Sequence, residues 1–158
     1  MEPQPLTFAD TAPWSATVSR EMPVAPERVF AVLADHRGWP RWVRSGVTSV
    51  EPTSDPEVGV GATRTVTFGR LLTIEERFLA WDEPTLWAFT GTGGSMPAFT
   101  RLVERFGVEP TERGCRVTYT MGTELARPLR PVGGLFVRGV RWGGRGILRR
   151  LEAAALAG

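Results

Sequence analysis

The last part of the sequence most limits what the chain can fold into, because its apolar residues recur with the period of a long helix. This stretch runs from residue 131 to residue 157. One face carries Phe136, Val140, Gly143, Ile147, Leu151 and Ala154, and the other carries Arg138, Arg141, Arg145, Arg149 and Glu152. At about 1.5 Å per residue, roughly 26 helical residues reach about 39 Å, which is enough to cross a whole sheet.

The rest of the chain alternates apolar and polar residues with period two, which predicts about seven strands. We expect the strands at residues 15–24, 46–51, 62–68, 72–81, 85–92, 99–109 and 115–125. The hairpin 62–81 has one register in which three pairs on one face match in kind: Arg64 with Glu76, Val66 with Ile74, and Phe68 with Leu72. Turns of hairpin length between most strands indicate an antiparallel meander.

Between the first two strands, segment 22–42 predicts a short helix and a loop. Pro26 suits the first helical turn, where Glu27 also favours the helix dipole. Gly38 and Pro40 end the helix. The apolar stripe of this helix and the two tryptophans of the loop are Val29, Phe30, Leu33, Trp39 and Trp42.

The same segment carries a resemblance to a known family. It reads Ala-Pro-x-x-Val-Phe-x-x-Leu-x-Asp at residues 25–35 and Trp-Pro-x-Trp at residues 39–42. This pattern resembles the opening of the START-like proteins (the SRPBCC superfamily), and most of all their bacterial polyketide cyclase/dehydrase-like branch. The resemblance implies an α+β helix-grip fold, in which an antiparallel sheet curls around a long C-terminal helix and two short helices follow the first strand.

The chain has 158 residues, so we expect a single START-like domain at residues 15–158, preceded by a flexible arm at residues 1–14. The single cysteine, Cys115, rules out an internal disulfide, and the single histidine, His36, argues against a metal site of His and Cys ligands. We expect neither a metal nor a cofactor. No apolar run is long enough to span a membrane and the first residues lack a secretory pattern, so the expected location is cytoplasmic.

All 19 basic residues are arginines, which either codon usage or an anion-binding surface would explain. The helical stripe of arginines, with Arg127, Arg130 and Arg150 nearby, fits a solvated face, a phosphate site or contact with an anionic bilayer. The net charge is only +2 and no aromatic residues are interleaved on that face, so we expect no nucleic-acid partner. We also expect no stable membrane insertion, and a monomer or a homodimer.

Glycines are unusually frequent in the predicted C-terminal helix, at positions Gly133, Gly134, Gly139, Gly143, Gly144 and Gly146. Each costs about 1 kcal/mol relative to alanine in a helix interior. Two interpretations stay open: the glycines leave space beside a ligand or let the helix bend, or Gly143-Gly144 separates two shorter helices. Either way the helix face is short of side chains, which favours a cavity over a filled core.

We therefore expect an apolar pocket between sheet and helix. Its predicted lining is Trp39, Trp42, Val66, Phe68, Ile74, Phe78, Phe89, Phe106, Tyr119, Phe136, Val140, Gly143 and Ile147. For any one of these residues, plain core packing is the better interpretation, whereas the whole set in this architecture favours a pocket.

Polar residues that interrupt the inward-facing rows are the candidate catalytic residues: Arg64, Glu76, Glu104 and Tyr119. An isolated buried charge is too costly to persist, so each charged one needs a partner or water. Arg64 and Glu76 form either a structural salt bridge or a polar anchor for a ligand carbonyl or hydroxyl. Tyr119 is a candidate hydrogen-bond donor to a ligand, and His36, in the loop at the expected mouth, is either an acid–base group or a surface residue.

Two functions fit these observations. The first is a binding protein that holds a hydrophobic small molecule, such as a lipid or a polyketide-like compound, between sheet and helix. The alternative is an enzyme of the polyketide cyclase/dehydratase kind, which would fold a poly-β-keto chain in the same cavity and assist aldol condensation and water loss. A weaker third hypothesis is a membrane-surface or partner-binding protein that uses the arginine stripe.

Overall fold

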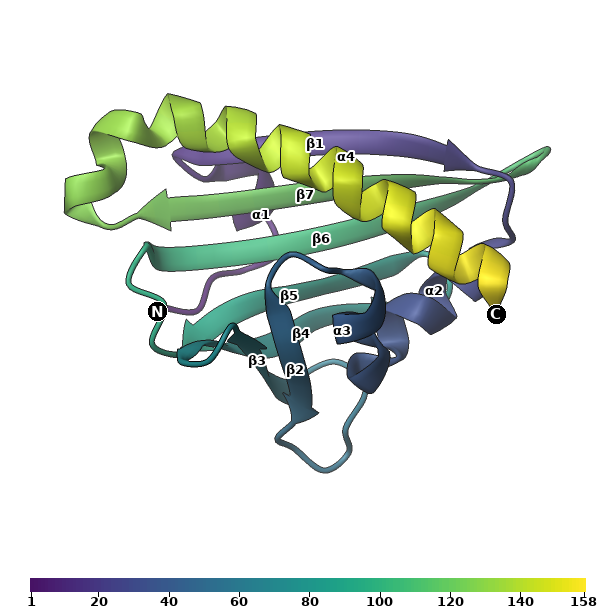
Figure 1. The fold of residues 1–158 in the computed structure, drawn as a ribbon, viewed down its shortest axis with the longest axis horizontal. Coiled ribbons are helices and arrows are strands. Elements are labelled where there is room, and N and C mark those ends of the chain that lie inside the picture. Colours follow the sequence, from purple (N-terminus) through teal and green to yellow (C-terminus); the bar gives the residue numbers. More distant parts are fainter.

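A computed structural model describes residues 1–158, in which a seven-stranded antiparallel sheet curls around one long helix (Figure 1). The elements in chain order are α1 (Phe8–Thr11), β1 (Trp14–Met22), α2 (Pro26–Ala34), the 3-10 helix η1 (His36–Gly38), α3 (Trp39–Trp42), β2 (Val47–Pro52), β3 (Thr63–Phe68), β4 (Leu72–Asp82), β5 (Leu86–Gly93), β6 (Phe99–Thr111), β7 (Gly114–Leu125), the 3-10 helix η2 (Arg127–Val132) and α4 (Gly133–Ala157). The strand order is β1-β7-β6-β5-β4-β3-β2, so strands β2 to β7 form a meander and β1 pairs with β7. The expected helix-grip fold is confirmed.

The register predicted for the central hairpin is also confirmed. Arg64 lies opposite Glu76, Val66 opposite Ile74 and Phe68 opposite Leu72. Gly69, which follows β3, has φ +58, a left-handed conformation that glycine adopts without strain. Matched cross-strand pairs and a glycine at the turn therefore fix this register together.

Helix α4 runs without a break through Gly143 and Gly144, so the interpretation as two shorter helices is wrong. It packs mainly on β1 rather than across the middle of the sheet (Figure 1). The helix approaches the sheet closely at Gly133, where an added Cβ would overlap the Trp14 ring of β1, and at Gly144, where an added Cβ would lie 2.9 Å from Val18 Cγ2 and 3.1 Å from Tyr119 Cδ1. Gly144 therefore lets the helix backbone lie directly on β1 and β7. No helix of the structure combines the length and the apolarity that crossing a membrane requires.

The apolar face of α4 divides into two sides. The side against the sheet is buried and includes Gly144, Leu148, Leu151 and Ala155. The second side is only half-buried and includes Phe136, Val140, Gly143, Ile147 and Ala154. The second set makes up most of the apolar face that the sequence predicted. The predicted face therefore lies next to the side of α4 that contacts the sheet, rather than on that side.

Helix α2 closes the far end of the sheet below the C-terminal end of α4 (Figure 1). Pro26 occupies its first turn, and Val29, Phe30 and Leu33 are fully buried, as their spacing predicts. The ring of Phe30 packs edge-on against Trp81 at a centroid distance of 5.9 Å. These contacts anchor the segment that carries α3 and its tryptophans.

The first residues of the chain do not form the loose arm that we expected. They contain α1, whose Phe8 and Ala9 are buried, and Asp10 makes two 2.8 Å hydrogen bonds with Arg105 on β6. The backbone N–H of Gln4 donates to the Thr90 hydroxyl at 2.9 Å. This segment was missed because one helical turn is too short to show a period.

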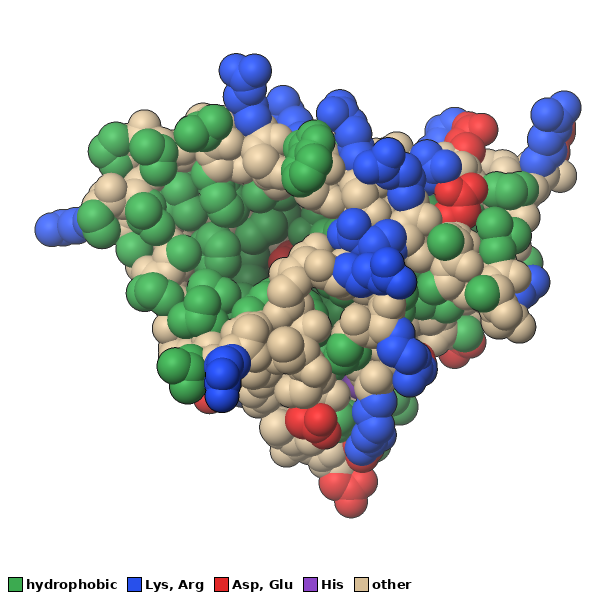
Figure 2. Space-filling view, in the orientation of Figure 1, with side chains coloured by type: hydrophobic (Ala, Val, Ile, Leu, Met, Phe, Trp, Pro, Cys, Tyr) green, Lys and Arg blue, Asp and Glu red, His purple; other side chains and the backbone are tan.

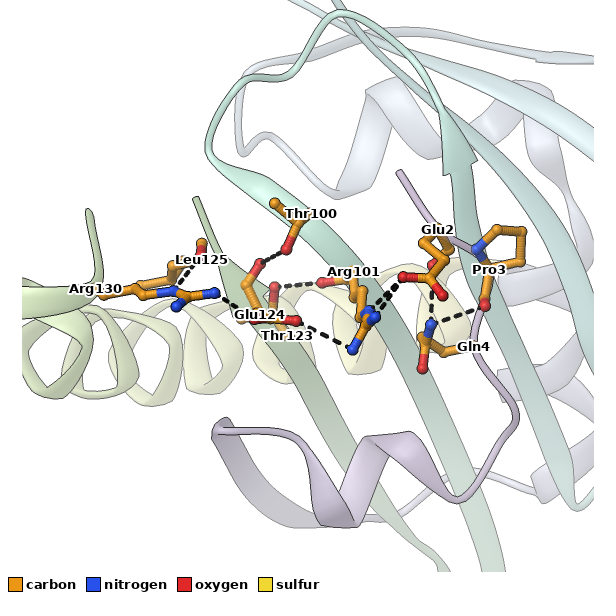
Figure 3. A network of polar contacts seen from close by, with 9 residues as sticks. All are labelled: Glu2, Pro3, Gln4, Thr100, Arg101, Thr123, Glu124, Leu125 and Arg130. Atoms are coloured by element: carbon orange, nitrogen blue, oxygen red, sulfur yellow. Dashed lines mark hydrogen bonds and ion pairs between the residues drawn. The ribbon is translucent and has the colours of Figure 1, made fainter. Parts of the chain in front are cut away.

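A chain of ion pairs ties both ends of the fold to the sheet (Figure 3). Arg101 on β6 pairs with Glu2 and, at 3.3 Å, with Glu124 on β7. Glu124 in turn accepts from Arg130 of η2 at 2.6 Å. The network holds the N-terminal segment and the start of the C-terminal helical segment on neighbouring strands.

Candidate functional site

A hollow opens between the sheet and the half-buried side of α4, walled mostly by hydrophobic side chains and with an acidic side chain at its floor (Figure 2). Half-buried apolar residues pack on the core from α4 and from the strands of the sheet. On α4 they are Phe136, Val140 and Ile147, and on the facing strand ends and loop they are Phe68, Met96 and Phe99. Phe99 and Phe136 meet edge-on at 5.8 Å, so sheet and helix touch at one end of this hollow.

Two pairs of polar side chains lie on the inward-facing rows of the sheet. The Tyr119 hydroxyl donates to Glu104 Oε2 at 3.0 Å, from β7 to β6. Arg64 Nε donates to Glu76 Oε2 at 2.7 Å, from β3 to β4. Arg64, Glu76 and Tyr119 are buried, but Glu104 is only half-buried. Because its row faces inward, the exposed part of Glu104 faces the hollow.

The guanidinium of Arg64 is enclosed by aromatic rings. It lies 4.2 Å from the ring centroid of Trp39, 4.9 Å from Trp87, and 5.2 Å from both Phe78 and Phe89. Its two terminal nitrogens have no hydrogen-bond partner in the protein. The negative faces of the rings and one carboxylate therefore compensate the buried positive charge, with desolvated cation–π contacts contributing about 2 kcal/mol.

The cluster contains one cation and two carboxyl groups, which decides where a proton resides. Burial raises the pKa of Glu76, and the guanidinium of Arg64 opposes that rise. Burial and the negative charge of Glu76 raise the pKa of Glu104 to about 7, against the opposing effects of the Tyr119 hydrogen bond and Arg64. Burial also raises the pKa of Tyr119 well above its ordinary value. Near neutral pH, Arg64 offsets the charge of Glu76, and Glu104 is only partly ionised, so the cluster carries little net charge.

This arrangement places a carboxyl group that gains and loses a proton near pH 7 at the floor of an apolar hollow. When protonated, Glu104 can accept from Tyr119 and donate its own O–H to an oxygen of a bound molecule. When ionised, it can take a proton from such a molecule. The site can therefore bind a carbonyl or hydroxyl group and exchange a proton with it.

His36 is not at the surface of the loop. It is buried, its ring stacks on Trp81 at 5.7 Å and meets Phe78 edge-on at 5.4 Å. Burial, with help from the charge of Arg64, lowers the pKa of His36 to about 4, so it is neutral at pH 7. Neither ring nitrogen has a partner, and no three His, Cys, Asp or Glu side chains gather as a metal site would require.

The predicted lining residues fall into three groups. Val66, Ile74, Phe78, Phe89, Phe106 and Tyr119 are buried on the inward rows of the sheet. Phe68, Phe136, Val140, Gly143 and Ile147 are half-buried, and a Cβ added at Gly143 would meet nothing within 4 Å. Trp39 covers Arg64 and stacks on Trp87 at 5.3 Å. Their contact with a ligand stays a prediction.

Trp42 lies in a different place from the one expected. It lines a separate groove of about 870 Å³ between α2, α3 and the C-terminal end of α4, together with Val32, Arg150 and several alanines. Neither Glu104 nor its partner Tyr119 lines this groove. We therefore assign the candidate site to the hollow.

Sequence reasoning missed Phe99 and Met96 as residues beside the hollow. Strict alternation from Leu102 puts Phe99 on the outer face, but a register shift between Phe99 and Arg101 turns it inward. Met96 lies in the loop between β5 and β6, where no period applies. For Phe99 and Met96, the only signal in the sequence was that both side chains are large and apolar.

Comparison with known proteins gives a family match over nearly the whole chain. The sequence model of the family described as "Polyketide cyclase / dehydrase and lipid transport" matches residues 13–156. Uncharacterized proteins of Mycobacterium tuberculosis and Mycobacterium bovis are each 37% identical over 132 residues, which cover 84% of this chain and 77% of theirs.

Solved structures show the same fold at low sequence identity. A protein from Thermus thermophilus has a TM-score of 0.75 at 22% identity and covers 90% of this chain and 97% of its own. The di-domain ARO/CYC StfQ from the steffimycin biosynthetic pathway has a TM-score of 0.75 at 12% identity, covering 90% of this chain and 50% of its own. Ara h 8.0201 has a TM-score of 0.69 at 18% identity, covering 91% and 98%.

Proposed function

The chain belongs to the polyketide cyclase/dehydrase and lipid transport family, and from this membership we propose that it binds a hydrophobic small molecule, a lipid or a polyketide-like compound, in the hollow beside α4. The observation that carries the proposal is an apolar hollow with an acidic side chain inside it, next to the inward-facing sheet rows that carry the hydrogen-bonded Glu104 and Tyr119. Apolar walls supply affinity through burial, and one polar pair orients the ligand. A carbonyl or hydroxyl oxygen on the ligand would accept the proton that Glu104 holds.

The second candidate is catalysis in the same hollow, and the pKa of Glu104 favours it. A group with a pKa of about 7 is suited to both giving and taking a proton at neutral pH. In an aldol condensation, the ionised carboxylate of Glu104 would take a proton from the α-carbon of one ketone, and that carbon would attack the second carbonyl while the hollow holds the two reacting carbons together. Glu104 would then return the proton to the alkoxide that forms. Loss of water would need the same carboxylate to take the remaining α-proton and deliver it to the departing hydroxyl.

Two measurements test binding. Native mass spectrometry of the purified protein should show a co-purified mass, and a fluorescent fatty-acid or naphthalene-type probe should bind with a large gain in emission. Gly143→Leu places a side chain in the open space beside Val140 and Ile147, so we expect it to weaken probe binding at least tenfold. Gly134→Leu is the matched control, because Gly134 is exposed and also has open space.

Equal probe affinity in wild type, Gly143→Leu and Gly134→Leu would place the ligand elsewhere and overturn the assignment. Glu104→Gln separates binding from catalysis. The amide retains a hydrogen-bond donor of similar shape but cannot transfer a proton. Retained binding with loss of turnover of a poly-β-keto substrate supports the enzyme, and unchanged turnover refutes the role of Glu104.

A further inference from the structure

Large apolar side chains are exposed along η2 and the first half of α4. Leu129, Val132, Leu135 and Trp142 are four of the nine large hydrophobic residues exposed in the whole chain, and Leu135 and Trp142 are 71% and 78% exposed. Leu135 and Trp142 are seven residues apart, so they share one face of the helix. That face points away from Gly144, which lies on the sheet, and adjoins the half-buried side that borders the hollow.

Positive charge surrounds this apolar strip, and carboxylates occur only at its two ends, at Glu124 and Glu152. Between Glu124 and Glu152 the sequence has seven arginines and no Asp or Glu. Five of these arginines make neither an ion pair nor a side-chain hydrogen bond: Arg127, Arg138, Arg141, Arg145 and Arg149. Figure 2 shows the basic side chains along the border of the face on which the hollow opens.

A shallow depression lies next to Trp142. It has a volume of about 370 Å³ and is lined by Ser19, Arg20, Arg145, Leu148 and Arg149 as well as Trp142. Arg20 pairs with Glu152, but Arg145 and Arg149 have no partner, so two guanidinium groups beside this space are available to bind a phosphate group. Apolar and anion-binding features thus occur side by side on one helix.

We propose that the outer face of η2 and α4, defined by Leu129, Val132, Leu135, Trp142 and the five unpaired arginines, docks on an anionic lipid bilayer. The apolar strip enters the interface and the arginines contact lipid phosphates. This inference rests on the proposed function, since a hollow that takes up a hydrophobic molecule gains from opening beside the bilayer that supplies it. The docking is peripheral, with the helix lying along the surface.

The charge pattern argues against two other partners. A second copy in a two-fold interface would set this arginine-rich face against the same face of its partner, and like charges would repel. Nucleic acid would use the arginines but would leave Leu135 and Trp142 without apolar contacts. A bilayer satisfies both sets of side chains at once.

Co-sedimentation with vesicles tests the docking. Wild-type protein should bind vesicles of phosphatidylcholine with about 30% phosphatidylserine and should release at high salt, but should not bind pure phosphatidylcholine. The double variant Arg141→Gln/Arg145→Gln should lose about 30-fold in partition, from the contribution expected per arginine. Leu135→Gln/Trp142→Gln should lose at least tenfold.

The controls are matched in chemistry and lie away from α4. Arg77→Gln/Arg113→Gln removes two exposed arginines that make no ion pair, and Val58→Gln/Val60→Gln removes two exposed apolar residues. Both should bind vesicles as wild type does. Equal losses in test and control variants would overturn the proposal.

Other results would also overturn it. Equal binding to neutral and anionic vesicles would show that charge does not drive the docking. Binding of short duplex DNA that Leu135→Gln/Trp142→Gln leaves unchanged would indicate a nucleic-acid partner instead. A dimer in light scattering that the same double variant dissociates would indicate a second copy of the chain. Probe uptake without vesicles, measured on the same variants, should stay unchanged. If neither the wild type nor any variant binds vesicles but all still take up the probe, the docking is refuted and the proposed function is not. If the wild type binds anionic vesicles but takes up no probe, the proposed function is refuted.

Discussion

Replacing Arg64 by methionine should destabilise the protein strongly while leaving its surface untouched. Arg64 is fully buried, its partner Glu76 is 3% exposed, and the two are joined by a 2.7 Å hydrogen bond. Removing one member of a buried pair leaves the other charge uncompensated, which costs about 3–5 kcal/mol. The variant also loses the contacts of the guanidinium with Trp39 and Trp87. Since total stability is about 5–15 kcal/mol, the loss is a large fraction of it.

Urea unfolding monitored by tryptophan fluorescence measures this loss directly. We expect the free energy of unfolding to fall by about 3–5 kcal/mol and Tm by about 6–20 °C. The double variant Arg64→Met/Glu76→Met removes both charges and should recover most of the loss. The exposed pair Arg37–Glu57 supplies the control, since solvent screens that pair and Arg37→Met should leave the free energy of unfolding almost unchanged.

Two results would refute this reasoning. A loss below about 1 kcal/mol for Arg64→Met would mean that a proton or water compensates Glu76 without Arg64. A double variant no more stable than Arg64→Met would mean that the cost is lost packing against the rings rather than an unpaired carboxylate. The double-mutant cycle separates the two causes, because it reports only the coupling between the side chains.

Three further predictions concern pH and the glycines of α4. The pKa of Glu104 in the folded protein is raised to about 7, so between pH 4.5 and about 7 the folded protein holds a proton that the unfolded chain has released. The free energy of unfolding should therefore fall as pH rises through this range. Glu104→Gln should remove this pH dependence from urea midpoints measured between about pH 5 and about pH 8. The pKa of His36 is lowered to about 4, so as pH drops the unfolded chain takes up a proton before the folded protein does, and the free energy of unfolding falls from pH 6.5 to about 4. His36→Phe should lessen this loss, because phenylalanine does not titrate and its ring can pack against the same aromatic groups. Gly143→Ala should stabilise the protein by up to about 1 kcal/mol because its Cβ meets open space, whereas Gly144→Ala should destabilise it because its Cβ would crowd Tyr119. Thermal unfolding measures both effects, and equal changes in Tm for the two variants would contradict the packing described for α4.

Features that depend on local pattern were accessible from the sequence. The register of β3 and β4 followed from Arg64 opposite Glu76, because a buried charge needs a partner and only one alignment supplies it along with matched apolar pairs. The burial of Val29, Phe30 and Leu33 followed from helical spacing after Pro26. In both cases the physical requirement acts within a few residues of the chain.

Features set by how elements pack were not accessible in the same way. Hydropathy gives Gly143 and Gly144 the same value, and only the angle at which α4 lies on β1 decides that Gly144 meets Val18 while Gly143 faces open space. The inward turn of Phe99 depends on a bulge that the alternation of β6 does not reveal. The exposure of Trp142 follows from α4 lying to one side of the sheet, which leaves that face of the helix without a layer to cover it.

The ion pair and the proton of Glu104 are linked, and this gives a last test of the site. Burial raises the pKa of Glu104 most, and because Glu76 raises it more than Arg64 lowers it, the ion pair as a whole adds to that rise. In the double variant Arg64→Met/Glu76→Met both effects vanish, and burial alone should hold the pKa of Glu104 below about 7 but above 4.5. NMR titration of carboxyl carbons labelled in glutamate measures this value. An unchanged or higher pKa would show that Glu76 is not the charge that acts on Glu104, and that the four polar residues do not form one titrating cluster.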